Sequence, residues 1–127
     1  NIKADIIFIQ VDAQENPIEE IINFKENNIN VGANISNLDL NREYLPRVLE
    51  LSDDILVNTT HHDDFKQICD PEMIDFAKKL SKTKKVWIDG GITWDIYNSL
   101  KESDIHEAIM GRAIFLDKDE TIKKITK

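Results

Sequence analysis

The fold is decided by the stretch Val86-Trp87-Ile88-Asp89-Gly90-Gly91-Ile92-Thr93. Its β-branched and aromatic residues predict a buried strand over 85–89, which ends at Asp89. Two glycines follow at once, and Thr93 is a residue type that caps the amino end of a helix. A strand, a short glycine turn and a helix start in this order are typical of one βα unit of a parallel sheet.

Four more short apolar runs predict further strands, because each is rich in β-branched residues and is bounded by polar or turn residues. They cover residues 6–11, 30–35, 54–58 and 107–110. We expect the first and third of these strands to be buried on both faces. Trp87 alternates with Asp89 along its strand, and we expect it in the core.

The segments between the predicted strands have helical spacing of their apolar residues. Pro17 begins the first helix, Asp70 and Pro71 begin the third, Thr93 caps the fourth, and a polar helix over 117–127 ends the chain. The expected apolar positions are Ile18, Ile21, Ile22 and Phe24; Leu45, Val48 and Leu49; Ile74, Ala77 and Leu80; Ile96, Tyr97 and Leu100; Ile122 and Ile125.

The pattern is therefore (βα)₅ in a chain of 127 residues, with about 25 residues in each unit. Strict alternation predicts parallel strands with right-handed crossovers. Two architectures fit, an open doubly wound sheet or part of a (β/α)₈ barrel. We expect residues 1–127 to be a single domain. Because the sequence starts at Asn1, close to a strand, we expect it to be a piece of a longer chain.

Composition excludes several classes of function. Lys and Arg number 16 against 24 Asp and Glu, so the formal charge of −8 argues against nucleic acid as the main partner. No apolar run reaches the roughly 18–20 residues of a membrane span, so we expect neither a membrane span nor a signal peptide. The single Cys69 excludes an internal disulfide and a Cys-rich zinc site. We expect a cytoplasmic protein without membrane contact.

Two glycine segments are candidates for an anion site. The backbone N–H groups of Gly90 and Gly91 lie near a predicted helix start and suit a phosphate. The alternative is that they form only a tight turn, with Asp89 capping the helix. The second segment contains Gly111 and Arg112, after the last predicted strand, and Arg112 is a candidate partner of a phosphate or of a surface carboxylate.

These segments together resemble the ribulose-phosphate 3-epimerase family. The residues that carry the resemblance are Ala4-Asp5-Ile6-Ile7, Val31-Gly32-Ala33-Asn34-Ile35, Asp54-Ile55-Leu56-Val57, Ile88-Asp89-Gly90-Gly91-Ile92 and Met110-Gly111-Arg112-Ala113-Ile114-Phe115. They follow the order of that family's fourth to eighth strands, so the first three βα units of the barrel are expected to be missing. The segment around Asp89 is the most specific part.

The resemblance implies a TIM barrel that interconverts ribulose 5-phosphate and xylulose 5-phosphate, an activity of the pentose phosphate pathway. Asp89 would ligate a divalent metal ion (zinc, iron, manganese or cobalt) and act as one of two acid/base carboxylates. Gly90, Gly91, Gly111 and Arg112 would bind the phosphate of the ketose. The metal would stabilise the enediolate while the carboxylates transfer the proton. Two edges of an incomplete barrel also predict self-association, and hence a possible homo-oligomer.

The chain departs from the family pattern at several positions. Residues 59–65 read Thr-Thr-His-His-Asp-Asp-Phe and contain no glycine where the family has a glycine-rich loop. Gln10 replaces a histidine of the fourth strand, and Arg112 stands where the epimerases carry serine. Arg112 favours the related hexulose-phosphate synthases and ketogulonate-phosphate decarboxylases. The altered loop favours a non-catalytic phosphate-binding protein, and its adjacent His61 to Asp64 are expected to be solvated rather than to chelate a metal.

Overall fold

The computed structural model describes residues 6–60 and 68–109, and a five-stranded parallel sheet organises them. Each strand pairs in parallel with the next one along the chain, in the order β1-β2-β3-β4-β5. The strands are β1 (Ile7–Gln10), β2 (Val31–Ile35), β3 (Asp54–Asn58), β4 (Lys85–Asp89) and β5 (Glu107–Ile109). This confirms the predicted α/β class with parallel strands.

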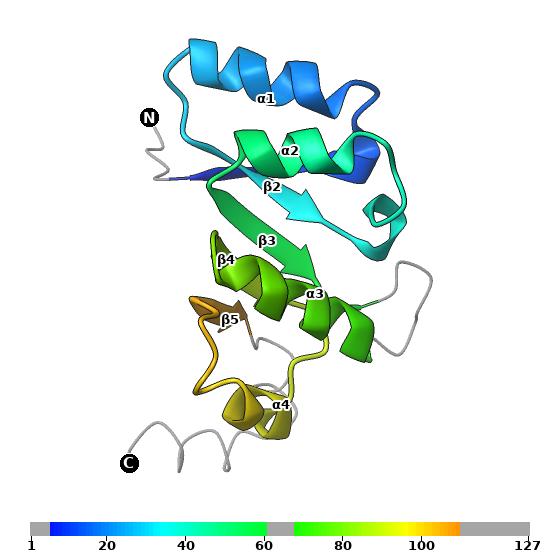
Figure 1. The fold of residues 1–127 in the computed structure, drawn as a ribbon, viewed down its shortest axis with the longest axis vertical. Coiled ribbons are helices and arrows are strands. Elements are labelled where there is room, and N and C mark those ends of the chain that lie inside the picture. The colour runs from blue at the N-terminus through cyan, green and yellow to red at the C-terminus, as the bar shows by residue number, and fades with distance from the viewer. Residues whose placement is uncertain (1–5, 61–67, 110–127) are drawn as a thin grey trace.

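Helices connect the strands and lie on one side of the sheet. They are α1 (Pro17–Glu26), α2 (Leu45–Leu51), α3 (Pro71–Ser81) and α4 (Trp94–Ser99), with short 3₁₀ turns η1 (Val11–Ala13) and η2 (Asn37–Asp39). Figure 1 shows α1, α2 and α3 following one another along the same face of the sheet, with α4 beyond α3. Among the described residues, no helix has the length and apolar character needed to cross a membrane.

The predicted helix starts are confirmed by their capping contacts. The Asp70 side chain accepts a hydrogen bond from the Glu72 backbone N–H at 3.0 Å, and Pro71 opens α3. Thr93 Oγ1 accepts from the Ile96 backbone N–H at 3.3 Å at the start of α4. Since Thr93 caps this helix, Asp89 does not, and the capping alternative for Asp89 is wrong.

The main core lies between the helices and the face of the sheet that they cover. Every second residue of the central strands points to this face, which leaves those side chains with almost no exposed surface. The strands contribute Val31, Ala33, Ile35, Ile55, Val57, Val86 and Ile88, and the helices contribute Ile21, Val48, Met73 and Ala77. This packing fixes the register of the sheet, because a slip of one residue would turn every apolar side chain outward.

The opposite face of the sheet is concave. Phe8 on β1 and Trp87 on β4 both point to it, and their ring centroids are 5.3 Å apart in an edge-to-face contact. Three strand spacings separate β1 from β4, about 14 Å in a flat sheet. The two rings meet because the sheet curves, and because Gly32 between them has no side chain: a Cβ there would lie 2.5 Å from the Phe8 ring. The described strands therefore form a curved wall, as part of a (β/α)₈ barrel does.

Four expectations about burial need correction. β1 is not buried on both faces: Ile7 is 41% exposed, because β1 is an edge strand of the described sheet. Trp87 lies half-buried on the concave face and not in the core under the helices. Tyr97 is 37% exposed on the short α4. The third strand is fully buried on one face only, at Ile55 and Val57, since Asp54, Leu56 and Asn58 on its other face are partly exposed. The predicted helix over 117–127 and residue 110 of the last strand lie outside the described residues.

Candidate functional site

Asp89 is the last residue of β4, and its side chain belongs to the concave face. In the sheet register it lies between Asn58 of β3 and Ile109 of β5. Within residues 6–60 and 68–109, its carboxylate has no hydrogen-bond partner. Partial burial of the carboxyl group at this strand end raises its pKa above the ordinary value of 3.8. Among the described residues, Asp89 is therefore a carboxylate without a partner at the carboxyl edge, by which we mean the edge of the sheet formed by the carboxyl ends of the strands.

The glycine turn after Asp89 has a backbone that few other residues could adopt. Gly90 has φ of 121° and Gly91 has φ of 67°. A Cβ on Gly90 would lie 2.9 Å from Asn58 Oδ1 and 2.9 Å from Thr60 Cγ2, so the turn packs tightly against the end of β3. The N–H groups of Gly90 and Gly91 donate no hydrogen bond to any other described residue. They remain free to bind an anion.

Thr59 fixes the position of this turn from the neighbouring strand. Its backbone N–H donates to the Asp89 carbonyl at 2.8 Å. Its buried hydroxyl lies 3.1 Å from the Asp89 carbonyl oxygen and 2.6 Å from that of Gly90. The backbone on both sides of the Asp89–Gly90 peptide is thus tied to β3. The sequence reasoning treated Thr59 only as part of an altered loop and missed this role.

Uncharged polar side chains accompany Asp89 along the carboxyl edge. Gln10 pairs in register with Asn34 at the ends of β1 and β2, and Asn58 pairs with Asp89 at the ends of β3 and β4. All four side chains share the concave face by strand alternation. Gln10 Nε2 donates to Asp12 Oδ1 at 2.8 Å. The sequence reasoning noted Gln10 only as a departure from a family pattern, although the ends of adjacent predicted parallel strands could have pointed to the whole row.

A hydrogen-bonded network fixes the segments after β1 and β2. Ser36 Oγ donates to Asp12 Oδ2 at 2.5 Å, and the Ser36 backbone N–H donates to Asp39 Oδ2 at 2.8 Å. The Tyr44 hydroxyl donates to Asp39 Oδ1. Burial raises the pKa of Asp39 despite these donors, and burial together with Asp39 raises that of Tyr44. Both carboxylates of the network are partnered, so we assign it a structural role.

The described residues do not by themselves form a metal site. Among them, no three His, Cys, Asp or Glu side chains lie close enough together to hold an ion. Asp89 supplies a carboxylate, but its cross-strand neighbours Asn58 and Ile109 offer no second one. The expected phosphate ligands Gly111 and Arg112, and the polar run 61–64, lie outside the described residues.

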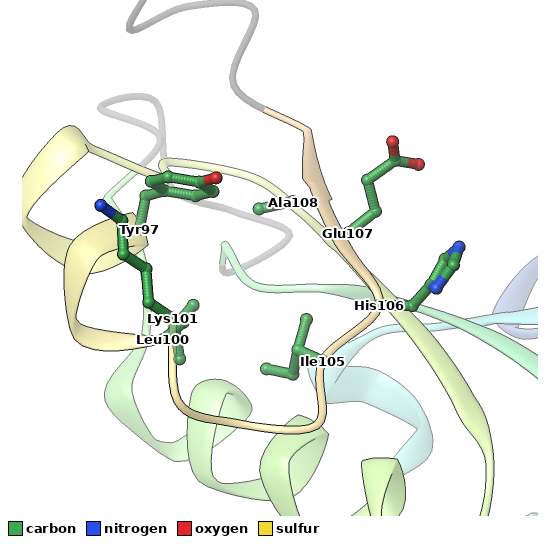
Figure 2. A pocket seen from close by; sticks show the side chains of 7 residues that line it. All are labelled: Tyr97, Leu100, Lys101, Ile105, His106, Glu107 and Ala108. Atoms are coloured by element: carbon green, nitrogen blue, oxygen red, sulfur yellow. The ribbon is translucent and has the colours of Figure 1, made fainter. Parts of the chain in front are cut away.

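A hollow of about 180 Å³ lies away from this edge, between α4 and the beginning of β5. Figure 2 shows Tyr97, Leu100 and Ile105 turned towards one another across it, while His106 and Glu107 point to the other side of the strand. It lies at the amino end of β5, opposite the carboxyl edge, and its volume is below the roughly 300 Å³ typical of small-molecule sites. We therefore place the candidate site at Asp89 and not in this hollow.

A curved parallel sheet with a free carboxylate and a glycine turn at its carboxyl edge defines the class of protein. It is a (β/α)-barrel type of domain, in which chemistry takes place at that edge. The model of the ribulose-phosphate 3 epimerase family matches residues 1–115, and the chain belongs to this family. Among curated proteins, no relative matches the sequence.

Proposed function

We propose that the chain is the part of a sugar-phosphate epimerase that carries Asp89 as a proton-transfer group. The substrate would be ribulose 5-phosphate or xylulose 5-phosphate, interconverted at C3. One observation carries the proposal: a carboxylate without a partner in the described structure ends β4, and a glycine turn with free N–H groups follows directly. Membership of the ribulose-phosphate 3 epimerase family supports the same activity.

The chemistry requires a base next to the carbon that is epimerised. The Asp89 carboxylate would take the proton from the carbon adjacent to the carbonyl group, and the two electrons of the C–H bond would form a C=C bond. Return of a proton to the other face of that carbon completes the epimerisation. The backbone N–H groups of Gly90 and Gly91 would bind the phosphate, with Gly111 and Arg112 as further proposed contacts. The six residues of α4 make its dipole a minor contribution.

A divalent metal ion remains a proposal that the described residues support only through Asp89. Such an ion would stabilise negative charge on the enediolate oxygens when bound. Its other ligands would come from residues beyond the described ones, because no suitable group of side chains surrounds Asp89 there.

We further propose that residues 1–127 supply strands four to eight of a barrel, as one domain, and that the other strands complete the site. β1 and β5 form the two edges of the described sheet, and unpaired strand edges favour association. The 127-residue chain on its own is then expected to lack epimerase activity and to self-associate. Full turnover of ribulose 5-phosphate by the purified chain would contradict this part of the proposal.

A lyase of the hexulose-phosphate synthase or ketogulonate-phosphate decarboxylase type is the second candidate, because Arg112 stands where the epimerases carry serine. The third is a non-catalytic protein that binds sugar phosphates, favoured by the absence of glycine from residues 59–65. Both keep the anion site at Gly90 and Gly91 and differ from the epimerase in what happens at the substrate carbon.

The product of the complete gene, incubated with ribulose 5-phosphate in D₂O, separates these candidates. An epimerase forms xylulose 5-phosphate and incorporates deuterium at C3, which proton NMR detects. When formaldehyde is added to a parallel incubation, a lyase of the synthase type instead condenses it with ribulose 5-phosphate to a hexulose phosphate. Binding of the sugar phosphate without either product would leave the non-catalytic candidate. The absence of both xylulose 5-phosphate and deuterium incorporation at C3 would refute the proposed epimerase.

A further inference from the structure

We propose that the side-chain amide of Asn58 donates hydrogen bonds to the carbonyl oxygen of the substrate, beside Asp89. This inference rests on the proposed function, because it assigns the group that holds the oxygen next to the carbon that Asp89 would deprotonate. It concerns a residue that the sequence reasoning did not single out.

The orientation of the Asn58 amide follows from its contacts with Thr60. The Thr60 backbone N–H donates to Asn58 Oδ1 at 3.1 Å, and the Thr60 hydroxyl donates to the same atom at 2.9 Å. A backbone N–H can only donate, so the atom it contacts is the amide oxygen and not the nitrogen. Both N–H bonds of Asn58 therefore belong to the atom that points away from Thr60.

The Asn58 nitrogen is available to a ligand. Within the part of the chain that the structure describes, Nδ2 has no hydrogen-bond acceptor. It is also not a buried polar atom, since the one such atom without a partner among those residues is Ser52 Oγ. Two N–H donors thus face space that solvent or a ligand can enter.

The location of Asn58 brings these donors next to the proposed base. Asn58 and Asp89 are directly paired in the parallel register of β3 and β4 and share the concave face. Neighbouring strands are about 4.8 Å apart, so the two side chains are adjacent at the carboxyl edge. The Gly90 backbone packs close to the amide oxygen, since a Cβ at that position would lie only 2.9 Å from Asn58 Oδ1.

Asp89 and Asn58 would act together in the same enolisation step. An Asp89 oxygen takes the proton from the carbon next to the carbonyl, and the two electrons of the C–H bond form the new C=C bond. The π pair of the carbonyl moves onto its oxygen, where the Asn58 N–H groups stabilise the developing negative charge. When the enediolate collapses, an electron pair on the oxygen re-forms C=O, and the carbon takes a proton from Asp89 or from water. Asn58 is unchanged at the end.

The Asn58→Asp variant removes both donors and retains the shape and the two bonds accepted from Thr60. In the product of the complete gene, we expect deuterium exchange by this variant to fall by about 10²–10³-fold, the usual effect of losing one donor to an oxyanion. Asn58→Leu removes the donors without adding charge next to Asp89 and is expected to fall similarly. Exchange at the wild-type rate by Asn58→Leu would overturn the inference and leave the proposed function intact. The exposed Asn98→Asp of α4 is the matched control and should keep full activity.

Thr60 is a positioning residue in this scheme. Thr60→Ser keeps the hydroxyl donor to Asn58, whereas Thr60→Val loses it with little change in volume. We expect Thr60→Val to lower kcat more than it changes KM, and Thr60→Ser to restore kcat. Equal kcat values for the two variants would contradict the positioning role of the Thr60 hydroxyl.

A measurement without turnover tests the contact itself. The probe is a phosphorylated hydroxamate whose oxygens imitate the enediolate, with inorganic phosphate as the control. In ¹⁵N NMR, the Asn58 side-chain signals should shift with the hydroxamate and not with phosphate. Shifts at the Gly90 and Gly91 amides without one at Asn58 would overturn the inference alone. If no signal of the carboxyl edge shifts, the proposed function fails and the inference fails with it.

Discussion

Replacing Gly90 by alanine is a direct test of the turn that positions Asp89. The backbone φ of 121° at Gly90 lies in a region that L-residues rarely adopt. The added Cβ would also meet Asn58 Oδ1 at 2.9 Å, Thr60 Cγ2 at 2.9 Å and the Thr60 backbone nitrogen at 3.0 Å. The variant therefore combines backbone strain with overpacking.

Each of these two effects has a known scale. Backbone strain of this kind costs about 1–3 kcal/mol. Overpacking of a tightly packed site costs about 1–3 kcal/mol more. Gly90→Ala is thus expected to lower the free energy of unfolding by about 2–6 kcal/mol. At a urea m-value of about 2 kcal/mol/M, a loss of 4 kcal/mol moves the unfolding midpoint by about 2 M.

Urea unfolding followed by circular dichroism measures the loss, and a double-mutant cycle identifies its cause. Thr60→Ala removes the Cγ2 atom that the new methyl group would touch, so Gly90→Ala should cost less in that background, by on the order of 1 kcal/mol. The backbone strain should remain. Strictly additive losses, or a loss below about 1 kcal/mol for Gly90→Ala alone, would refute the described packing of the turn.

Three further predictions concern other described residues and the anion site. Tyr44→Phe removes a donor to the buried Asp39 and should cost about 1.5–3 kcal/mol at pH 7 in urea unfolding, against less than about 0.5 kcal/mol for the exposed Tyr97→Phe. Because this donor lowers the Asp39 pKa, its loss raises that pKa further. The cost should therefore shrink as pH falls through the raised pKa of Asp39 and the carboxylate gains its proton, and a cost independent of pH would contradict the assignment. Ser52→Ala removes a fully buried hydroxyl that has no partner among residues 6–60 and 68–109 and should raise the free energy of unfolding by about 1 kcal/mol; destabilisation would show that the hydroxyl is hydrogen-bonded. Gly91→Asp should weaken binding of a sugar phosphate far more than that of the unphosphorylated sugar in a titration, and equal losses would mean that the loop is only a turn.

The order of elements could be predicted from the sequence because local signals agreed with the packing. Pro17, Asp70 and Thr93 begin helices where expected, since each acts within one turn of the chain. Val86 and Ile88 are buried as expected, whereas Trp87, which was expected in the core, points to the other face of β4. The exposure of Ile7 could not be predicted, because burial of a strand depends on which neighbours flank it in the sheet.

Only part of the candidate site could be predicted from the sequence. Asp89 and Gly90 stood out because a carboxylate and a glycine at a strand end are a local pattern. The roles of Asn58, Thr59 and Thr60 depend on the register between β3 and β4, which a sequence pattern does not specify. Asn58 and Asp89 end two predicted strands that are adjacent in a parallel sheet, and this could have indicated that their side chains lie close together.

Replacing Asp89 by asparagine tests the central claim most directly. The measurement is deuterium incorporation from D₂O at C3 of ribulose 5-phosphate by the product of the complete gene, with urea unfolding alongside and the exposed Asp75→Asn of α3 as the matched control. General acid–base catalysis is worth about 10²–10⁴-fold, so we predict that Asp89→Asn lowers the exchange rate by about 10³-fold and leaves the unfolding midpoint close to that of the wild type. An Asp89→Asn protein that exchanges at the wild-type rate would contradict the assignment of Asp89 as the proton-transfer group.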